Sequence, residues 1–170
     1  MEKKLILNNL LKKYAYKDCY HIEYGGFLSN HFSHGIISLF KMDFSEKKLE
    51  DFCIKYKNHI TLNSKLEPPR ENDFHKISNE EELFSFLGKK RNYLGIVDFF
   101  YKEKNENKKF SRNVYNLIKY YLPNLNKGLA GAALHPFINM GYALDIQDEN
   151  LIIESLASQV YSNLPFENNV

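Results

Sequence analysis

Residues 23–39, EYGGFLSNHFSHGIISL, show how this chain is built. After the break at Gly25 and Gly26, apolar residues recur at helical spacing, which predicts a helix over about residues 28–41. His31 and His34 are three residues apart, so we expect both imidazoles on one face of that helix, one turn apart. Such a pair suits two metal ligands, a metal ligand with its neighbour, or the polar wall of a pocket.

The same helical spacing recurs along almost the whole chain, whereas the alternation typical of strands is scarce. Helices are predicted at residues 3–16, 28–41, 46–56, 79–87, 93–100, 114–122, 126–144 and 149–163, the last of them ended by Leu164 and Pro165. The segment between the third and fourth helices shows no period and contains two adjacent prolines, so we expect a loop, either a lid over a substrate or a plain excursion. The sequence therefore predicts an all-α protein, with residues 1–170 forming a single domain of seven to eight helices.

Several polar residues and prolines mark the predicted helix ends. Ser78 and Glu81 have the spacing of a capping box, and Asp148 is a suitable N-cap for the last helix. Pro123 is expected to stop the sixth helix, because proline lacks the N–H that an interior position needs. Residues 102–109 are mostly charged and are predicted to be a linker.

Composition narrows the functional class. The formal net charge is +2, with acidic and basic residues interspersed, which argues against a nucleic-acid partner. No apolar run approaches the ~20 residues of a membrane span, and the lysine-rich N-terminus does not resemble a signal peptide. Two isolated cysteines predict a reducing, cytoplasmic environment. Aromatic residues make up 15% of the chain, which indicates either core filling or a pocket for a flat ring compound.

A second stretch, residues 128–142, is rich in small residues that would let a helix or a ligand approach closely. If it is helical, one face carries a row of residues at steps of three and four: Gly131, Ala132, His135, Asn139 and Tyr142. Pro136 cannot donate an N–H, so it either kinks this helix or starts a new segment.

The histidines are the main candidates for chemistry. His135, placed beside His31 and His34 by helix packing, would complete a three-imidazole site of a kind that suits zinc, iron or copper. The chain contains no Glu-x-x-His, no His-Glu-x-x-His, no Walker loop and no Gly-x-Gly-x-x-Gly. His59 and His75 are predicted to be surface groups, whereas the role of His21 is left open.

Four blocks resemble, in order, the questin oxidase family over about residues 20–162. These blocks are Gly26 to His34, Met42 to Glu46, Leu87 to Tyr93 with Phe99 and Phe100, and Gly131 to Leu144. The chain is similar to the N-terminal half of a typical member. One difference is that some relatives have a histidine where this chain has Asn139.

The resemblance implies a helical oxidoreductase that opens the ring of an anthraquinone-type polyketide, with NADPH or a non-haem iron centre. It implies that His31, His34 and His135 are catalytic and hold the metal. A small aromatic molecule would contact Asn30, Asn139 and Tyr142. A homodimer that completes the site is one arrangement that this length allows. The alternatives are a non-catalytic helical binding module and a protein with a structural zinc.

Overall fold

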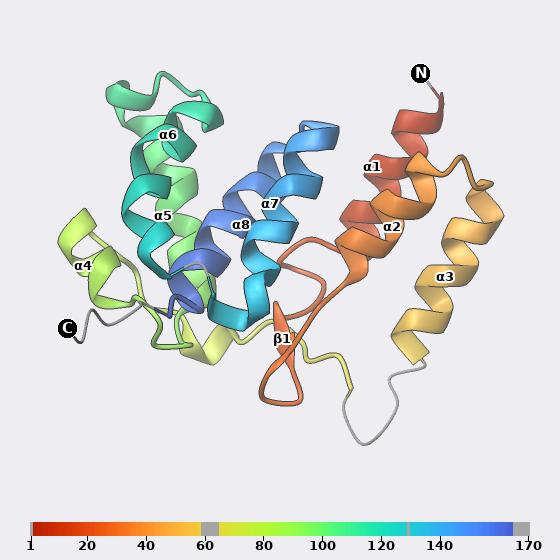
Figure 1. Ribbon diagram of the computed structural model, residues 1–170, viewed down its shortest axis with the longest axis horizontal. Helices are drawn as coiled ribbons and strands as arrows, with labels where there is room; N and C mark the ends of the chain where they lie inside the picture. The colour runs from red at the N-terminus through yellow and green to blue at the C-terminus, as the bar shows by residue number, and fades with distance from the viewer. Residues whose placement is uncertain (1, 59–64, 129, 165–170) are drawn as a thin grey trace. The chain divides into compact units, whose positions relative to one another are not determined.

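The computed structural model describes residues 2–58, 65–128 and 130–164 (Figure 1). Eight α-helices and one small hairpin lie within these ranges. They are α1 (Glu2–Tyr14), β1 (Glu23–Tyr24), β2 (Leu28–Ser29), α2 (Phe32–Lys41), α3 (Glu46–Asn58), α4 (Glu80–Ser85), α5 (Tyr93–Glu106), α6 (Val114–Leu125), α7 (His135–Ile146) and α8 (Glu149–Tyr161). Four short 3₁₀ helices join them: η1 (Glu71–Asp73), η2 (Lys108–Phe110), η3 (Asn126–Gly128) and η4 (Gly131–Leu134). The predicted all-α class is confirmed.

The chain divides into two compact units, Met1–Pro69 and Arg70–Val170. In the first unit, α1 packs on α2 and α3, and α2 packs on α3. The ring of Phe32 is fully buried and lies among other aromatic rings, with centroids 5.6 Å from Tyr14, 5.5 Å from Tyr20 and 4.6 Å from Tyr56. Much of the chain's aromatic content therefore fills a core, as one of the two interpretations of the composition proposed.

The start of the second helix differs from the prediction. Residues 28 and 29 form a strand that pairs antiparallel with residues 23 and 24. Gly25 and Gly26 make the turn at φ of 59° and 84°, a left-handed conformation that glycine adopts without a steric penalty. Because the hairpin uses this backbone, α2 begins at Phe32, four residues later than predicted.

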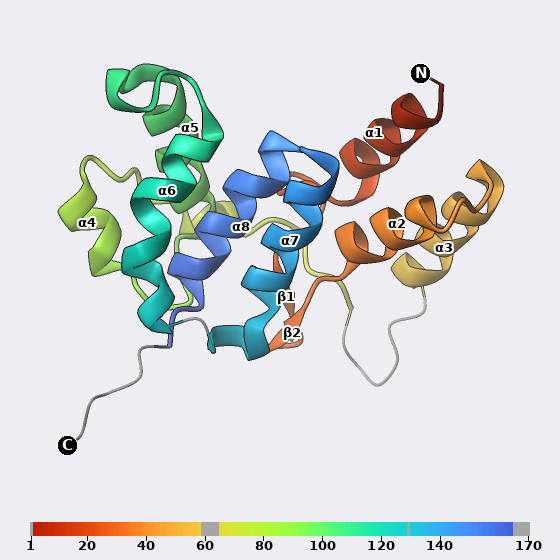
Figure 2. The ribbon, with the colours of Figure 1, turned by 45° about the horizontal axis from the view of Figure 1, so that its top comes forward.

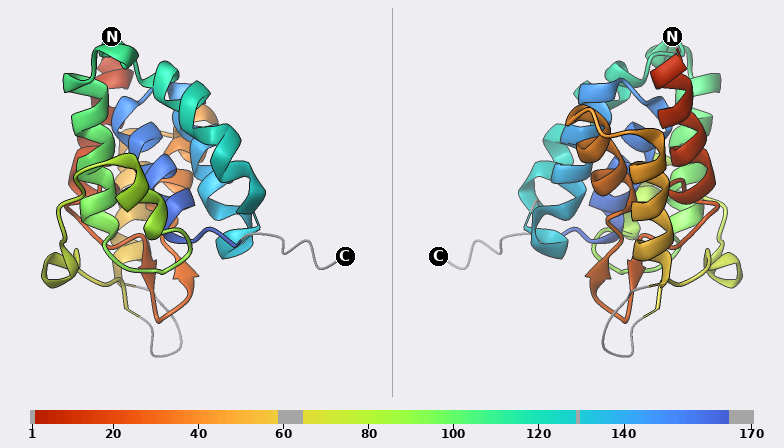
Figure 3. Two further views of the ribbon diagram at one scale, coloured as in Figure 1. Left: turned by 90° about the vertical axis from the view of Figure 1, so that its left-hand side faces the viewer. Right: turned by 90° about the vertical axis from the view of Figure 1, so that its right-hand side faces the viewer.

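In the second unit, α8 is the central helix, and α5, α6 and α7 all pack on it. Figure 3 shows α8 between α5 and α6, and Figure 2 shows α7 beside it. Every residue from Leu151 to Tyr161 is buried, including several polar ones. A helix that is buried all round carries no solvated face, so its polar side chains must find partners in the interior.

Four predicted boundaries in this unit are wrong, and three of them lie between residues 79 and 125. The cap of α4 is Asn79, whose Oδ1 accepts the N–H of Glu82 at 2.9 Å, so the predicted pair is displaced by one residue. The charged segment is mostly helical, because α5 continues to Glu106. Pro123 lies inside α6 and does not end it. Leu125, two residues later, is fully buried, and this burial stabilises the helical turn that follows the proline.

The last boundary concerns α7, which begins at His135 and not near residue 126. Before it, Ala132, Ala133 and Leu134 all have positive φ, at 46°, 51° and 67°. These left-handed residues cannot continue a right-handed helix. Pro136 therefore starts a new segment, and its place in the first turn costs no hydrogen bond.

Candidate functional site

The first unit brings two of the predicted site histidines together at the start of α2. The ring centroids of His31 and His34 lie 5.2 Å apart, with an angle of 70° between the planes. His31 precedes the first helical residue, and its side chain makes no capping hydrogen bond. His34 lies in the first turn and is buried. The predicted neighbourhood of the two rings is therefore present, although only one of them is inside the helix.

A tyrosine from α3 holds the backbone at this point. The N–H of His31 donates to the hydroxyl oxygen of Tyr56 at 2.8 Å. Burial raises the pKa of Tyr56 well above its usual value, so the phenol stays protonated across the physiological range. The sequence predicts no role of its own for Tyr56. The contact spans 25 residues, and no local pattern indicates it.

Close packing between α2 and α3 keeps Tyr56 in place. The ring of Phe52 stacks on Tyr56 with centroids 5.7 Å apart. A Cβ atom added to Gly35 would lie 2.0 Å from the tip of the Phe52 ring, so the glycine leaves room for the ring to lie against α2 in this position. Gly35, on the same helix as His34, therefore makes room for the ring that stacks on Tyr56.

Asn30 fixes the turn that leads into α2. Its Oδ1 accepts the N–H of Phe32 at 3.0 Å, and its Nδ2 donates to the carbonyl of His21 at 3.3 Å. His21 is itself buried, and its Nδ1 lies 2.9 Å from the carbonyl oxygen of Glu23. Both ends of the Asn30 amide thus bind the chain, which ties the position of His31 to the hairpin.

The second unit places His135 at the first position of α7. Its Nδ1 lies 2.6 Å from the carbonyl oxygen of Ala132, which can only accept, so Nδ1 carries the proton. In the neutral ring the lone pair is then on Nε2. Histidines that bind metals usually donate their other ring N–H to a carbonyl or carboxylate in this way. The left-handed turn before α7 is what brings that carbonyl back to the ring.

Asn139 and Tyr142 follow His135 at four and seven residues along α7, so these three share a helical face as predicted. Asn139 is buried, and Tyr142 is half-buried. Gly131 and Ala132 lie outside this helix, so the longer predicted face does not exist. Gly131 instead lies against the end of α8, where an added Cβ would be 1.6 Å from the carbonyl oxygen of Ser162.

The spacing of the imidazole pair matches part of a metal site. Two imidazoles bound to one ion at about 2.1 Å and a tetrahedral angle have ring centres roughly 5 Å apart, close to the spacing of His31 and His34. His31 and His34 belong to the first unit and His135 to the second. Among residues 2–58, 65–128 and 130–164, no group of three or more histidine, cysteine, aspartate or glutamate side chains could hold a metal. The three-histidine site stays a prediction.

His75 and His59 are predicted to be surface groups. The side chain of His75 is 62% exposed, and its Nε2 lies 2.8 Å from Oε1 of Glu82, as expected of a surface group. The N–H of Ser78 and the His75 ring together lower the pKa of the Glu82 carboxyl. His59 lies outside the described residues.

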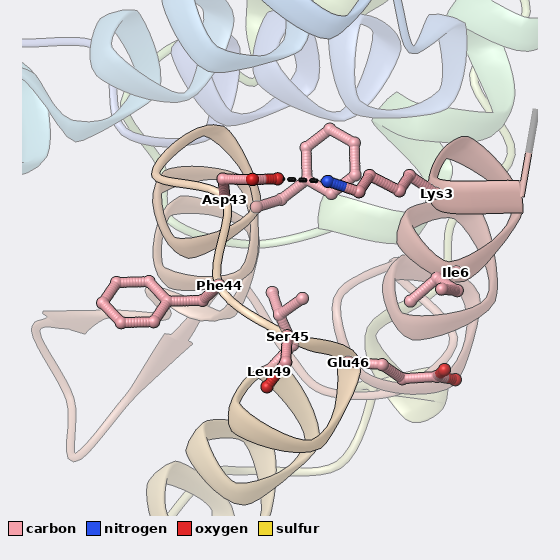
Figure 4. A pocket seen from close by; sticks show the side chains of 8 residues that line it. Lys3, Ile6, Asp43, Phe44, Ser45, Glu46 and Leu49 are labelled. Carbon is pink, nitrogen blue, oxygen red and sulfur yellow. Dashed lines mark hydrogen bonds and ion pairs between the residues drawn. The ribbon is translucent and has the colours of Figure 1, made fainter.

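Each unit also has a pocket. The first, of about 170 Å³, is lined by Lys3, Ile6, Phe40, Asp43, Phe44, Ser45, Glu46 and Leu49. Figure 4 shows the ion pair between Lys3 and Asp43 across its rim. The second, of about 340 Å³, is lined by Asp73, His75, Phe86, Arg91 and Asn92. The predicted site residues line neither pocket.

Comparisons with known proteins agree with the resemblance in the sequence. The pattern of the questin oxidase-like family matches residues 28–168, which is most of the chain. A search of curated proteins and a search of solved structures each found no match. None of the described helices is long and apolar enough to cross a membrane. By the extent of the family match, this chain belongs to the questin oxidase-like family, an oxidoreductase-type family.

Proposed function

We propose that this protein oxidises a small aromatic molecule of the polyketide or quinone type, with a histidine-bound iron. The observation that supports this most is the pair of adjacent imidazoles, His31 and His34, inside the part of the chain that matches the family. A redox site for oxygen chemistry needs ligands that leave coordination positions open, and imidazoles are common ligands for such iron.

In this proposal His31, His34 and His135 hold the iron, which when bound supplies the activation of dioxygen. Tyr56 positions His31 through the backbone, since its hydroxyl receives the His31 N–H. The Ala132 carbonyl keeps the proton of His135 on Nδ1, so Nε2 is the nitrogen that faces a ligand. Asn139 and Tyr142, farther along α7, orient the aromatic substrate by hydrogen bonding, and Asn30 contacts it beside His31.

NADPH is the proposed electron donor, and it would bind without a Gly-x-Gly-x-x-Gly turn, which the sequence lacks. We also propose a cytoplasmic location, which the two cysteines support because neither forms a disulfide. The partner in this account is the small molecule, and a homodimer of the chain is the proposed assembly.

The test measures turnover. The purified 170-residue chain is loaded anaerobically with ferrous iron and given 1,8-dihydroxyanthraquinone and dioxygen, with and without NADPH. Oxygen uptake and mass spectrometry of the products report the reaction, and size-exclusion chromatography reports the assembly. We expect turnover by the unchanged chain and by His75→Ala, a surface control, and its loss in His31→Ala and His34→Ala.

Two results would contradict the proposal. Binding of the anthraquinone without any oxygen uptake would favour a helical binding module that has no chemistry. Equal turnover in the unchanged chain and in His31→Ala would show that the imidazole pair does not serve the reaction.

A further inference from the structure

One buried side chain in α8 has hydrogen-bonding groups that the chain does not use. Gln159 is only 4% exposed. Neither its Nε2 nor its Oε1 makes a hydrogen bond within the part of the chain that the structure describes. Water would satisfy both atoms in the unfolded chain, so burying them without partners opposes folding. A glutamine at this position therefore calls for a reason other than stability.

Three other buried polar side chains in this half of α8 and just after it have hydrogen-bond partners. The Ser155 hydroxyl donates to the Leu151 carbonyl at 2.6 Å, and the Ser162 hydroxyl donates to the Ser158 carbonyl at 2.8 Å. The amide of Asn163 reaches the carbonyl of Leu125 at 3.1 Å. Gln159 is thus an exception within a helix whose polar groups otherwise find partners.

Gln159 lies at the same end of the α7–α8 pair as His135. The two helices are consecutive, joined by Gln147 and Asp148, and packed side by side (Figure 2), so the start of α7 meets the end of α8. Contacts at that end fix this register. Gly131 lies against the carbonyl of Ser162, and the N–H of Leu164 donates to the carbonyl of Gly128 at 3.1 Å. His135 opens α7 there, and Gln159 is in the last turn of α8.

The two groups of a primary amide determine which hydrogen-bonding groups a ligand must offer. The Nε2 group donates, and the Oε1 atom beside it accepts. A molecule that offers a carbonyl next to a hydroxyl satisfies both atoms at once. A hydroxyquinone, with a hydroxyl on the carbon next to the ring carbonyl or across the peri position, has this arrangement.

We infer that Gln159 is a substrate-contacting residue at the His135 end of α7 and α8, where its amide binds the adjacent hydroxyl and carbonyl of a hydroxyquinone. This inference rests on the proposed function, because it names the same class of substrate. It adds a residue that the sequence does not single out and that the predicted histidine site does not include.

The experiment compares two ligands and two variants in the full chain. Calorimetry or fluorescence measures the affinity for 1,8-dihydroxyanthraquinone and for 1,8-dimethoxyanthraquinone, which keeps the carbonyls but lacks the hydroxyl donors. Gln159→Met removes the amide and keeps an unbranched side chain of similar length. Gln147→Met makes the same change at an exposed position, and Gln159→Leu serves as a second variant if the methionine does not fold.

We expect Gln159→Met to raise the melting temperature of the free protein, because a buried amide without partners is removed. We expect the same variant to bind the dihydroxy compound about tenfold more weakly, as the loss of roughly one net hydrogen bond predicts. Its affinity for the dimethoxy compound should change less, and Gln147→Met should change neither affinity.

An unchanged affinity of Gln159→Met for the dihydroxy compound would overturn the inference while leaving the proposed function intact. Failure of the unchanged protein to bind either anthraquinone would overturn the proposed substrate class, and this inference with it. A lower melting temperature with unchanged affinity would show that Gln159 is paired inside the fold, which also overturns the inference.

Discussion

Replacing Gly131 by alanine is expected to disrupt the contact between the segment before α7 and the end of α8. The new Cβ would lie 1.6 Å from the carbonyl oxygen of Ser162 and 2.6 Å from its carbon. Such contacts are not found below 3.0 Å, so one of the two backbones must move by about 1.4 Å. A backbone carbonyl cannot rotate away as a side chain can, because it is part of the chain that ends α8.

The size of the effect follows from the overpacking of a close contact, which costs about 2 kcal/mol and more if the backbone cannot adjust. For a chain of this length each kcal/mol lowers the melting temperature by roughly 2–4 °C, so Gly131→Ala should melt about 4–8 °C below the unchanged protein. Gly141 offers a matched control on α7. An added Cβ there meets nothing within 4 Å, and alanine favours a helix over glycine by about 1 kcal/mol.

Thermal unfolding followed by circular dichroism at 222 nm measures both variants. The structure predicts opposite signs, a lower melting temperature for Gly131→Ala and a higher one for Gly141→Ala. Unchanged or increased stability of Gly131→Ala would refute the close approach of residue 131 to the end of α8. The same result would remove the register that places Gln159 level with His135.

Three further predictions concern other parts of the fold. Asp148→Ala should lower the free energy of unfolding in urea by about 1 kcal/mol, because Oδ1 of Asp148 accepts the N–H of Leu151 at 2.9 Å, and an unchanged urea midpoint would contradict this cap. Pro123→Ala should raise the stability of α6 by about 1–3 kcal/mol, since it restores an interior N–H, and a lower midpoint would show that the proline shapes the helix favourably. Burial raises the pKa of the Cys53 thiol to about 12, so at pH 8 a disulfide reagent should modify only Cys19 in the folded protein and both thiols in urea. Two reactive thiols in the native protein would contradict the burial of Cys53. The same pKa shift favours the protonated thiol in the folded state, so the contribution of Cys53 to the free energy of unfolding should decline as the pH rises above about 9.

The helical class could be predicted because the pattern that specifies it is local. Asp148 caps α8 as predicted, and Ile152, Leu156 and Val160 are all fully buried in it. The errors lie where tertiary contacts override local preference. The two-residue strand at Leu28 exists only because it pairs with residue 24, which no helical period reports.

Of the candidate site, the sequence predicted the proximity of two histidine rings, whereas the three-histidine site stays a prediction. The spacing of three residues correctly predicted that the rings of His31 and His34 lie together, although His31 precedes the helix instead of lying in it. The hydroxyl of Tyr56 that contacts the His31 backbone comes from another helix, so this contact could not be predicted from the sequence. The left-handed turn at Ala132 and Ala133 could not be predicted either, since alanine disfavours positive φ and local propensity predicts a helix there. That turn brings the Ala132 carbonyl to Nδ1 of His135 and so fixes the orientation of the ring.

The central proposal is that histidines of this chain hold one iron, and metal stoichiometry tests it most directly. The purified chain is incubated anaerobically with ferrous iron, desalted, and analysed by inductively coupled plasma mass spectrometry beside four variants. We predict close to one iron per chain for the unchanged protein and for His75→Ala, and a large loss in His31→Ala, His34→Ala and His135→Ala. Equal iron in all five proteins, or none in the unchanged chain, would contradict the claim.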